Sequence, residues 1–290
     1  MKPMRHFLLT LVILGLAAAS QIQAQVKVAV LHPLLGDLAQ QIGGQNVTVL
    51  NLVKPGTELH HFDPSAKDFA ALKGVSLVLA AGKNGENYLD KLADALGGGV
   101  KILEVGKAIP SLKDGQEHVD PHWWHSAANM KRAARIIADE LSSQDPAHSE
   151  AYKTGAADAS KKLDELHTWA QQQFTQIPKK DRVLVSAHNA FGYFCQDYGF
   201  KNVPVLGLSA EDDITPNQVV ATLKIIRENK VQAVFPEDQA NPKVLEEITR
   251  ESGARIGTPL NADGTLAGEG STFAGMLKHN VEAIVKGLKR

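Results

Sequence analysis

HSEAYKTGAADASKKLDELHTWAQQQFTQI, residues 148–177, is a long helical pattern near the middle of the chain. It holds no proline and a single glycine, and its large apolar side chains recur at helical spacing: Leu163, Leu166, Trp169 and Phe174. A continuous helix of about 30 residues would be roughly 45 Å long, which exceeds the width of a small lobe. We therefore predict a rigid helix that joins two halves of the molecule. A disordered linker, the competing interpretation, has little support in this pattern.

Short β-rich segments alternate with helical segments on both sides of this helix. Strands are predicted over residues 26–31, 47–53, 75–82, 100–106, 182–187, 203–209, 231–237 and 255–260. Helices are predicted over or near residues 35–44, 65–74, 86–98, 126–146, 190–198, 215–230, 241–252 and 272–288. Continuous apolar strands between helices indicate parallel sheets that are covered on both faces. The predicted fold class is therefore α/β, with two parallel-sheet α/β lobes joined by a single long bridging helix.

The first 24 residues have the features of a secretory signal peptide. Lys2 and Arg5 precede an apolar run, and small residues follow it. The apolar run is shorter than the about 20 residues of a membrane span, and an uncleaved anchor is the alternative. Four segments are predicted: a signal peptide (1–24), an N-terminal lobe (25–145), the bridging helix (146–178) and a C-terminal lobe (179–290).

The composition limits the partners and the compartment. The formal net charge is −1, from 31 basic and 32 acidic residues, and no basic patch stands out, so nucleic acid is not an expected partner. The only cysteine is Cys195, in an apolar stretch, and no cysteine near the cleavage site could carry a lipid. We expect a free periplasmic protein without a lipid anchor.

Imidazole and carboxylate side chains follow the predicted strands in both halves. They are His60, His61, His122, His125, His188 and Asp263. Ligands of open α/β sheets bind beyond the carboxyl ends of the strands. Two lobes that face each other at these edges would bring such groups together in a cleft. Three imidazoles and one carboxylate would suit Zn²⁺. An aromatic clamp around DPHWWH, residues 120–125, is the weaker alternative, since polar partners for a sugar or amino acid are missing nearby.

Four motifs in order make the chain similar to the zinc- and manganese-binding receptors of bacterial ABC importers. The stretch GTELHHFDPSAKD resembles the first family motif and implies His60 as a metal ligand. DPHWW implies His122, and HNAFGYF implies His188. PLNADGTLAG implies Asp263, although an Asp-Gly turn would also explain it. The resemblance covers the whole mature chain and implies two bridged lobes with the metal site in the cleft between them.

This resemblance implies high-affinity capture of a divalent transition metal in the periplasm and delivery to an ABC permease in the inner membrane. We expect Zn²⁺ as the cargo, because Mn²⁺ prefers more oxygen ligands. A manganese receptor of the same family is the alternative. We expect no enzymatic activity; an exported zinc hydrolase with Glu237 or Glu58 as base is disfavoured, because Asp263 would fill the position that a catalytic water needs. The protein is expected to be a monomer, and a periplasmic metal chaperone is a further candidate partner.

Residues beside the predicted ligands have assigned roles as well. Asp120 is expected to orient His122 through a hydrogen bond. Trp124 is expected to pack beneath the loop, with Trp123 nearer the surface. His125 is expected to be exposed or at the rim of the cleft.

Three further side chains complete the predicted surroundings of the site. His118 is expected to be exposed, like His125. His61 is expected behind the ligands or at the entrance. Glu237 is the competing carboxylate ligand.

Overall fold

The computed structural model describes residues 25–54, 56–57, 59, 62–113, 118–208, 214–237 and 243–289. The predicted signal peptide, His60, His61 and Glu58 lie outside these residues. None of the helices in the described part of the chain is long and apolar enough to cross a membrane. The predicted segment boundaries stay predictions.

The first half of the chain forms a parallel sheet in the order β2-β1-β3-β4. Its strands are β1 (Val26–Val30), β2 (Val47–Asn51), β3 (Leu77–Ala80) and β4 (Lys101–Glu104). The connecting helices are α1 (Pro33–Gly43), α2 (Ala66–Ala71) and α3 (Leu89–Leu96). All four strands lie within their predicted ranges.

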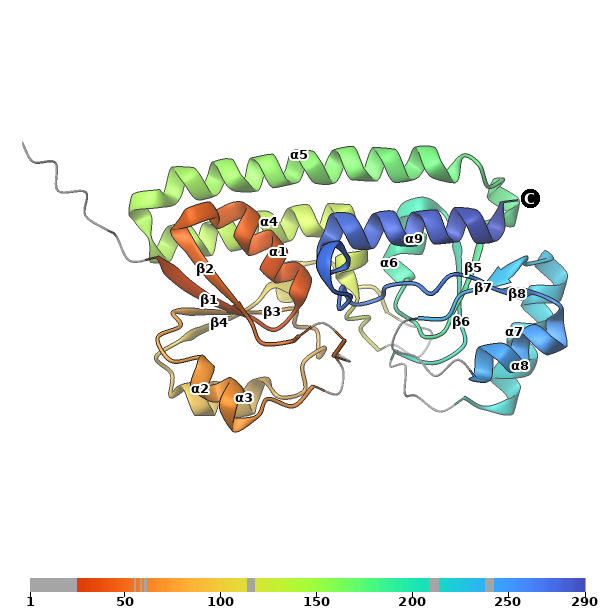
Figure 1. Ribbon diagram of the computed structural model, residues 1–290, viewed down its shortest axis with the longest axis horizontal. Coiled ribbons are helices and arrows are strands. Elements are labelled where there is room, and N and C mark those ends of the chain that lie inside the picture. Colours follow the sequence, from red (N-terminus) through yellow and green to blue (C-terminus); the bar gives the residue numbers. More distant parts are fainter. Residues whose placement is uncertain are drawn as a thin grey trace, which may run out of the picture.

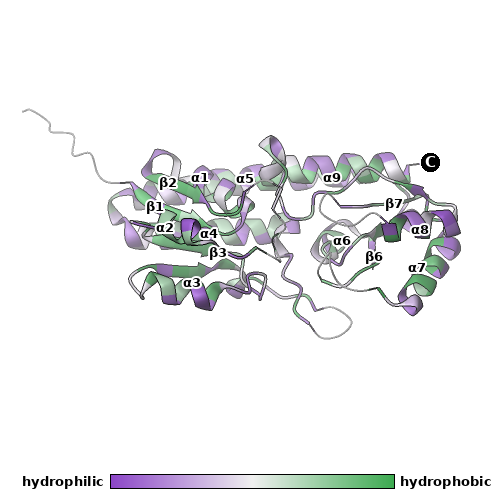
Figure 2. Cartoon of the chain, turned by 60° about the horizontal axis from the view of Figure 1, so that its bottom comes forward, coloured by the Kyte–Doolittle hydropathy of each residue, from purple (hydrophilic) through white to green (hydrophobic). Residues whose placement is uncertain are grey.

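Both faces of this sheet are covered, as its apolar strands require. Val28 and Val30 of β1 face the large core that includes α1, whereas Ala29 faces a second cluster with Leu72 and Leu92. Figure 2 shows hydrophobic residues along the strands and hydrophilic residues on the outer turns of the helices. The sheet therefore holds its loops on a rigid support that is buried on both sides.

The second half repeats the arrangement with shorter strands. They are β5 (Val183–Ser186), β6 (Lys201–Pro204), β7 (Ala233–Val234) and β8 (Arg255–Ile256). β5 pairs with β6 and β7 pairs with β8, both in parallel. A parallel bridge between Ser186 and Phe235 joins the two pairs. The resulting order β6-β5-β7-β8 corresponds to the order β2-β1-β3-β4 of the first sheet. His188 follows β5 and Asp263 follows β8, and these parallel strands end at the same edge of the sheet.

The helices of the second half are α6 (Gly192–Tyr198), α7 (Pro216–Asn229), α8 (Lys243–Ser252) and α9 (Phe273–Leu288). The prediction for β6 was shifted, because the strand begins at the polar residues Lys201 and Asn202. An edge strand tolerates such residues, and the amide of Asn202 bonds the side chain of Asn189 at 2.8 Å. The apolar stretch after Pro204 therefore placed the predicted strand too far toward the C-terminus.

The predicted bridging helix is α5 (Ser149–Phe174), which has 26 residues and a length of about 39 Å. It runs along both halves of the molecule (Figure 1), against α1 and α4 (Ala127–Gln144) at one end and α9 and α6 at the other. The fold class is confirmed, although α5 is four residues shorter than the quoted stretch: His148 lies in a preceding 3₁₀ turn. Arg182 fixes its end by donating to the carbonyls of Phe174 at 2.7 Å and Ile177 at 3.1 Å.

Candidate metal site

Two of the predicted ligands, one from each half, face each other. His122 and His188 are both buried, and their Nε2 atoms lie 3.4 Å apart. Their ring planes meet edge to face, with centroids 5.2 Å apart. The fourth strand of the first sheet and the first strand of the second sheet thus deliver imidazoles to one point.

Each of these rings has a carboxylate behind it. Asp120 Oδ1 lies 2.9 Å from Nδ1 of His122 and accepts a hydrogen bond from the His122 backbone N–H at 2.8 Å. Glu237 receives the backbone N–H of His188 at 3.1 Å, and its second oxygen contacts Nδ1 of the same ring. A carboxylate at Nδ1 favours the tautomer with the proton on that nitrogen and leaves the Nε2 lone pair for a metal.

The arrangement confirms the predicted hydrogen bond between Asp120 and His122, in which the carboxylate accepts. It also places Glu237 behind His188, where it orients the ring. A strand-end position drew attention to Glu237 in the sequence, but the sequence does not say whether such a carboxylate faces the metal or an imidazole.

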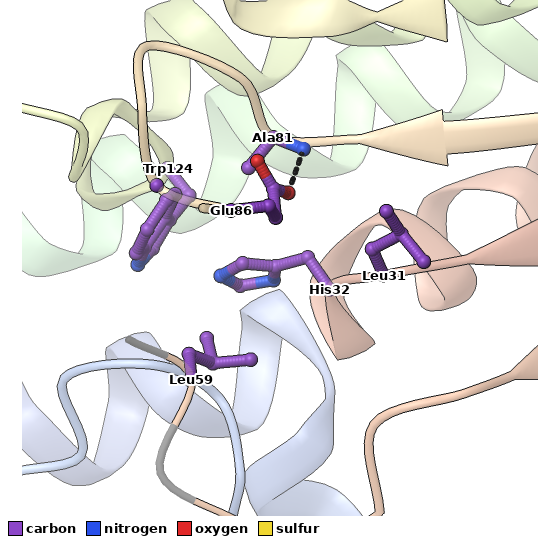
Figure 3. Close-up of a pocket in the computed structure, with 7 residues that line it drawn as sticks. Leu31, His32, Leu59, Ala81, Glu86 and Trp124 are labelled. Atoms are coloured by element: carbon purple, nitrogen blue, oxygen red, sulfur yellow. Dashed lines mark hydrogen bonds between the residues drawn. The ribbon is translucent and has the colours of Figure 1, made fainter. Parts of the chain in front are cut away.

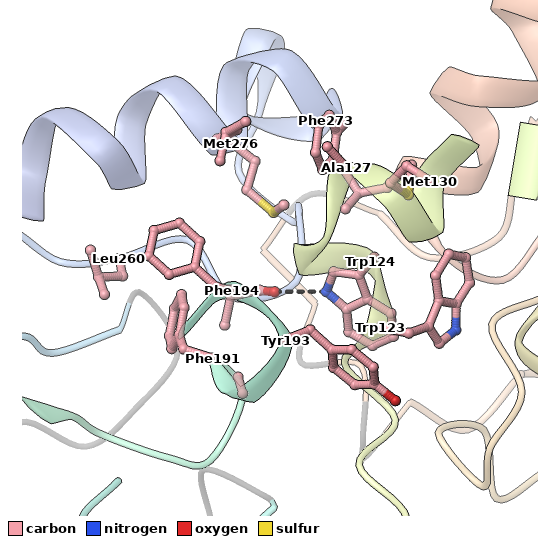
Figure 4. Close-up of a cluster of buried hydrophobic side chains, with 14 of the residues drawn as sticks. Trp123, Trp124, Ala127, Met130, Phe191, Tyr193, Phe194, Leu260, Phe273 and Met276 are labelled. Atoms are coloured by element: carbon pink, nitrogen blue, oxygen red, sulfur yellow. Dashed lines mark hydrogen bonds between the residues drawn. The ribbon is translucent and has the colours of Figure 1, made fainter. Parts of the chain in front are cut away.

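The two tryptophans that follow His122 fix its loop to the surrounding structure. Trp124 lies edge to face against His122 with centroids 5.3 Å apart, as expected. Its Nε1 donates to the carbonyl of Ala262, in the opposite half, at 2.9 Å (Figure 4). Trp123 is fully buried and donates to the carbonyl of Ala81 at 3.0 Å, so the expectation of a surface position was wrong. Gly106 makes room for it, because a Cβ there would lie 2.7 Å from the indole nitrogen.

Asp263 is buried in a tightly held loop. Asn261 accepts a hydrogen bond from the Gly264 N–H at 2.8 Å, and Asn280 of α9 bonds the backbone of Asn261 on both sides. Gly264 has a φ of +66°, and a Cβ there would lie 2.5 Å from the side chain of Leu34. Only glycine fits both demands, so this loop is fixed directly against α1 of the other half.

His60 lies outside the described residues, but Gly56 and Leu59, which precede it, are described. The backbone N–H of Gly56 donates to the carbonyl of Thr265 at 2.8 Å, two residues after Asp263. Leu59 lines a pocket together with Trp124. The described residues that precede His60 in the chain therefore lie close to Trp124 and to the residue two positions after Asp263.

Within the part of the chain that the structure describes, no three His, Cys, Asp or Glu side chains form a group that could hold a metal ion. His122 and His188 are brought together, and Asp263 is not placed in one group with them. The predicted set of four ligands therefore stays a prediction.

Two histidines differ in their exposure. His118 is exposed, as expected. His125 is only 1% exposed, so its predicted place at the rim was wrong. Its ring packs 4.7 Å from that of Phe191, and burial lowers its pKa to about 3.

A buried pocket beside the site contains residues that the sequence interpretation overlooked (Figure 3). His32 caps α1 through Nδ1, which accepts the N–H of Leu34 at 3.2 Å, and its ring lies 4.2 Å from Trp124. Glu86 accepts the N–H groups of Ala81 and Gly82 at 2.6 and 2.9 Å, and burial raises its pKa to about 7. His32 follows the first strand, so the rule that selected the other histidines could have found it.

A family model described as zinc-uptake complex component A, periplasmic (ZnuA), matches residues 28–287. The chain belongs to this family. Manganese-binding lipoprotein MntA of Halalkalibacterium halodurans is 31% identical over 268 residues, covering 91% of this chain and 89% of that protein. Iron-binding protein YfeA of Yersinia pestis is 31% identical over 267 residues, covering 90% and 86%.

The fold has relatives among solved structures. The periplasmic zinc binding protein TroA from Treponema pallidum superposes with a TM-score of 0.85 at 24% identity, covering 92% of this chain and 100% of that one. At this identity the likeness supports the fold alone. Members of the ZnuA family are metal-binding receptors of ABC importers, not enzymes, so the predicted family and the absence of an enzymatic role are confirmed by membership.

Proposed function

We propose that this receptor captures Zn²⁺ outside the cytoplasm with His60, His122, His188 and Asp263, and hands it to an ABC permease. The observation that carries the proposal is the pair of Nε2 atoms 3.4 Å apart, each on a ring with a carboxylate at Nδ1. Two nitrogens at about 2.0–2.1 Å from one zinc ion, at a tetrahedral angle, lie about 3.4 Å apart.

The charge distribution favours a cation at this point. With the protons on Nδ1, both Nε2 atoms present lone pairs to each other in a buried place, which is repulsive. A metal ion between them replaces the repulsion by two coordination bonds. The carboxylates of Asp120 and Glu237 strengthen both bonds, because they make the imidazoles more basic.

Manganese is the second candidate. Relatives such as MntA of Halalkalibacterium halodurans and of Bacillus subtilis are described as manganese-binding, at 31% and 30% identity. Against it, imidazole nitrogens suit Zn²⁺ better than Mn²⁺, and Mn²⁺ has the lowest affinity in the usual divalent series. Element analysis of the protein purified without a His-tag, followed by competition titration, separates the two: we expect zinc to displace manganese completely.

Protons should compete with the metal. Ligating imidazoles must be neutral, and an ordinary imidazole titrates near about 6.5. We therefore expect the affinity for Zn²⁺ to fall steeply when the pH drops from about 7.5 to about 5.5. Titration of the chelator-stripped protein at both pH values checks this, and an affinity that does not change with pH would count against imidazole ligands.

The remaining assignments follow from this function. Relatives described as ABC transporter substrate-binding proteins support a permease partner. Some relatives are described as lipoproteins, whereas Cys195, the only cysteine in the printed sequence, is buried. We propose a receptor without an attached lipid; intact mass of the protein from the periplasm tests this. A monomer and a metal chaperone remain predictions.

A further inference from the structure

His125 stands where three loops of the candidate site meet. It follows His122 by three residues in the first half. Its ring packs 4.7 Å from Phe191, which follows His188 by three residues in the second half. The ring also hydrogen-bonds the backbone of Ala262, the residue before Asp263.

Ala262 is thereby held by two neighbouring side chains of the opposite half. Its carbonyl also accepts the hydrogen bond of Trp124 Nε1 at 2.9 Å. From its own half, the Asn261–Asn280 pair fixes the preceding residue. His125 and Trp124 thus both bind the residue that precedes Asp263.

Packing alone does not explain a histidine at this position. The side chain is buried, and its Nε2 has no hydrogen-bond partner among the described residues. A buried polar atom without a partner destabilises the fold, and an apolar side chain of similar volume would avoid that cost. Trp124 would still satisfy the Ala262 carbonyl without His125.

We infer that His125 is a positioning residue that presents Asp263 to the metal held by His122 and His188. This inference rests on the proposed function, because it requires Asp263 to be a ligand. His125 itself does not coordinate the ion. His125 instead restricts the positions that the backbone of Asp263 can adopt.

The test compares His125→Leu with the wild-type chain and with His118→Leu, the matched control at an exposed histidine. We expect His125→Leu to bind Zn²⁺ about 10-fold more weakly, as is usual when a partner behind a ligand is removed. The melting temperature of its metal-free form should be unchanged or higher. His125→Gln, which keeps an N–H donor, should recover part of the affinity, and His118→Leu should change neither quantity.

A double-mutant cycle with Asp263→Ala shows whether His125 acts through Asp263. In the Asp263→Ala background, His125→Leu should cause no further loss of affinity, because coupled residues are not additive. X-ray absorption should find the same number of imidazole ligands in the wild type and in His125→Leu.

Three results would overturn the inference. The first is an affinity of His125→Leu equal to that of the wild type. The second is a lower affinity accompanied by a lower melting temperature of the metal-free variant. The third is one imidazole ligand fewer around the zinc in His125→Leu. His122→Ala separates this failure from that of the proposed function. If His122→Ala abolishes binding while His125→Leu does not weaken it, only the role of His125 is wrong; if His122→Ala binds like the wild type, the site itself is wrong.

Discussion

At the scale of single residues, each of the two facing imidazoles in the candidate site has a carboxylate at its Nδ1. Glu237 contacts both the backbone N–H and Nδ1 of His188, and both partners are buried. Asp120 does the same for His122. The repetition of one arrangement in both halves indicates that imidazole orientation is a requirement of the site.

Glu237→Gln tests this requirement. The amide keeps the size of the side chain but removes the negative charge that raises the basicity of His188. We expect the affinity for Zn²⁺ to fall about 10- to 100-fold in competition titrations. Glu246→Gln, at an exposed position of α8, is the control and should bind like the wild type. Equal affinities in both variants would show that the charge of Glu237 does not affect zinc binding.

The burial of His125 has a consequence for acid stability. Its pKa is lowered to about 3, whereas an imidazole in the unfolded chain titrates near about 6.5. Between these values the unfolded state binds a proton that the folded state does not bind. The group therefore makes the metal-free protein lose stability as the pH falls, by about 1.4 kcal/mol per pH unit.

Urea unfolding of the metal-free protein at pH 7, 6 and 5 measures this effect. The free energy of unfolding should fall less steeply with decreasing pH in His125→Leu than in the wild type. His118→Leu should follow the wild type, because that ring is exposed. Parallel curves for all three proteins would show that His125 takes up its proton in the folded state.

At the scale of elements, the single glycine of α5 has a specific reason. Gly155 lies against the end of α1, and a Cβ there would come within 2.4 Å of the Ile42 carbonyl oxygen and 2.9 Å of its Cα. These are backbone atoms, which cannot move aside as a flexible side chain could. The glycine therefore allows the bridging helix to approach the first half closely.

Gly155→Ala reverses the usual effect of helix propensity. Alanine favours a helix over glycine by up to about 1 kcal/mol, but here the added methyl group must push α1 away, at a cost of roughly 1–3 kcal/mol. We expect a lower melting temperature in calorimetry. Thr154→Ala, one residue earlier at an exposed position, should be neutral or slightly stabilising. A stabilised Gly155→Ala would mean that the two helices are less closely packed.

The sequence predicted elements better than it predicted the surroundings of side chains. Apolar strands and the periodic helix around Leu163 are local patterns, and they were found where expected except for β6, which was shifted. The burial of Trp123 and His125 depends on residues that are distant in the sequence, namely Ala81 and Phe191. No local pattern contains that information, and the choice of His60 over His61 as a predicted ligand came from family resemblance.

At the scale of the whole molecule, the two halves are joined by more than α5. Phe273 at the start of α9 donates its N–H to Asp37 of α1 at 3.1 Å. The hydroxyl of Tyr193 in α6 accepts the N–H of Leu112 at 2.9 Å and donates to the carbonyl of Asp120 at 3.2 Å. We expect a rigid helix with these cross-links to permit only a small tilt when the metal binds.

Small-angle X-ray scattering of the metal-free and zinc-loaded protein checks this rigidity. We expect the same radius of gyration in both states within the error of the measurement. A calcium-soaked sample controls for ionic effects, because a nitrogen-rich site does not suit Ca²⁺. A clear contraction that only zinc causes would indicate a hinge that α5 and these bonds do not restrain.

The proposed function requires both halves to supply ligands to one zinc ion. Anomalous diffraction at the zinc edge, on crystals of the loaded protein without a His-tag, tests it most directly. We expect one ion at about 2.0–2.2 Å from a nitrogen or oxygen of each of four residues, His60, His122, His188 and Asp263. An ion bound elsewhere, or held by residues of one half alone, would contradict it.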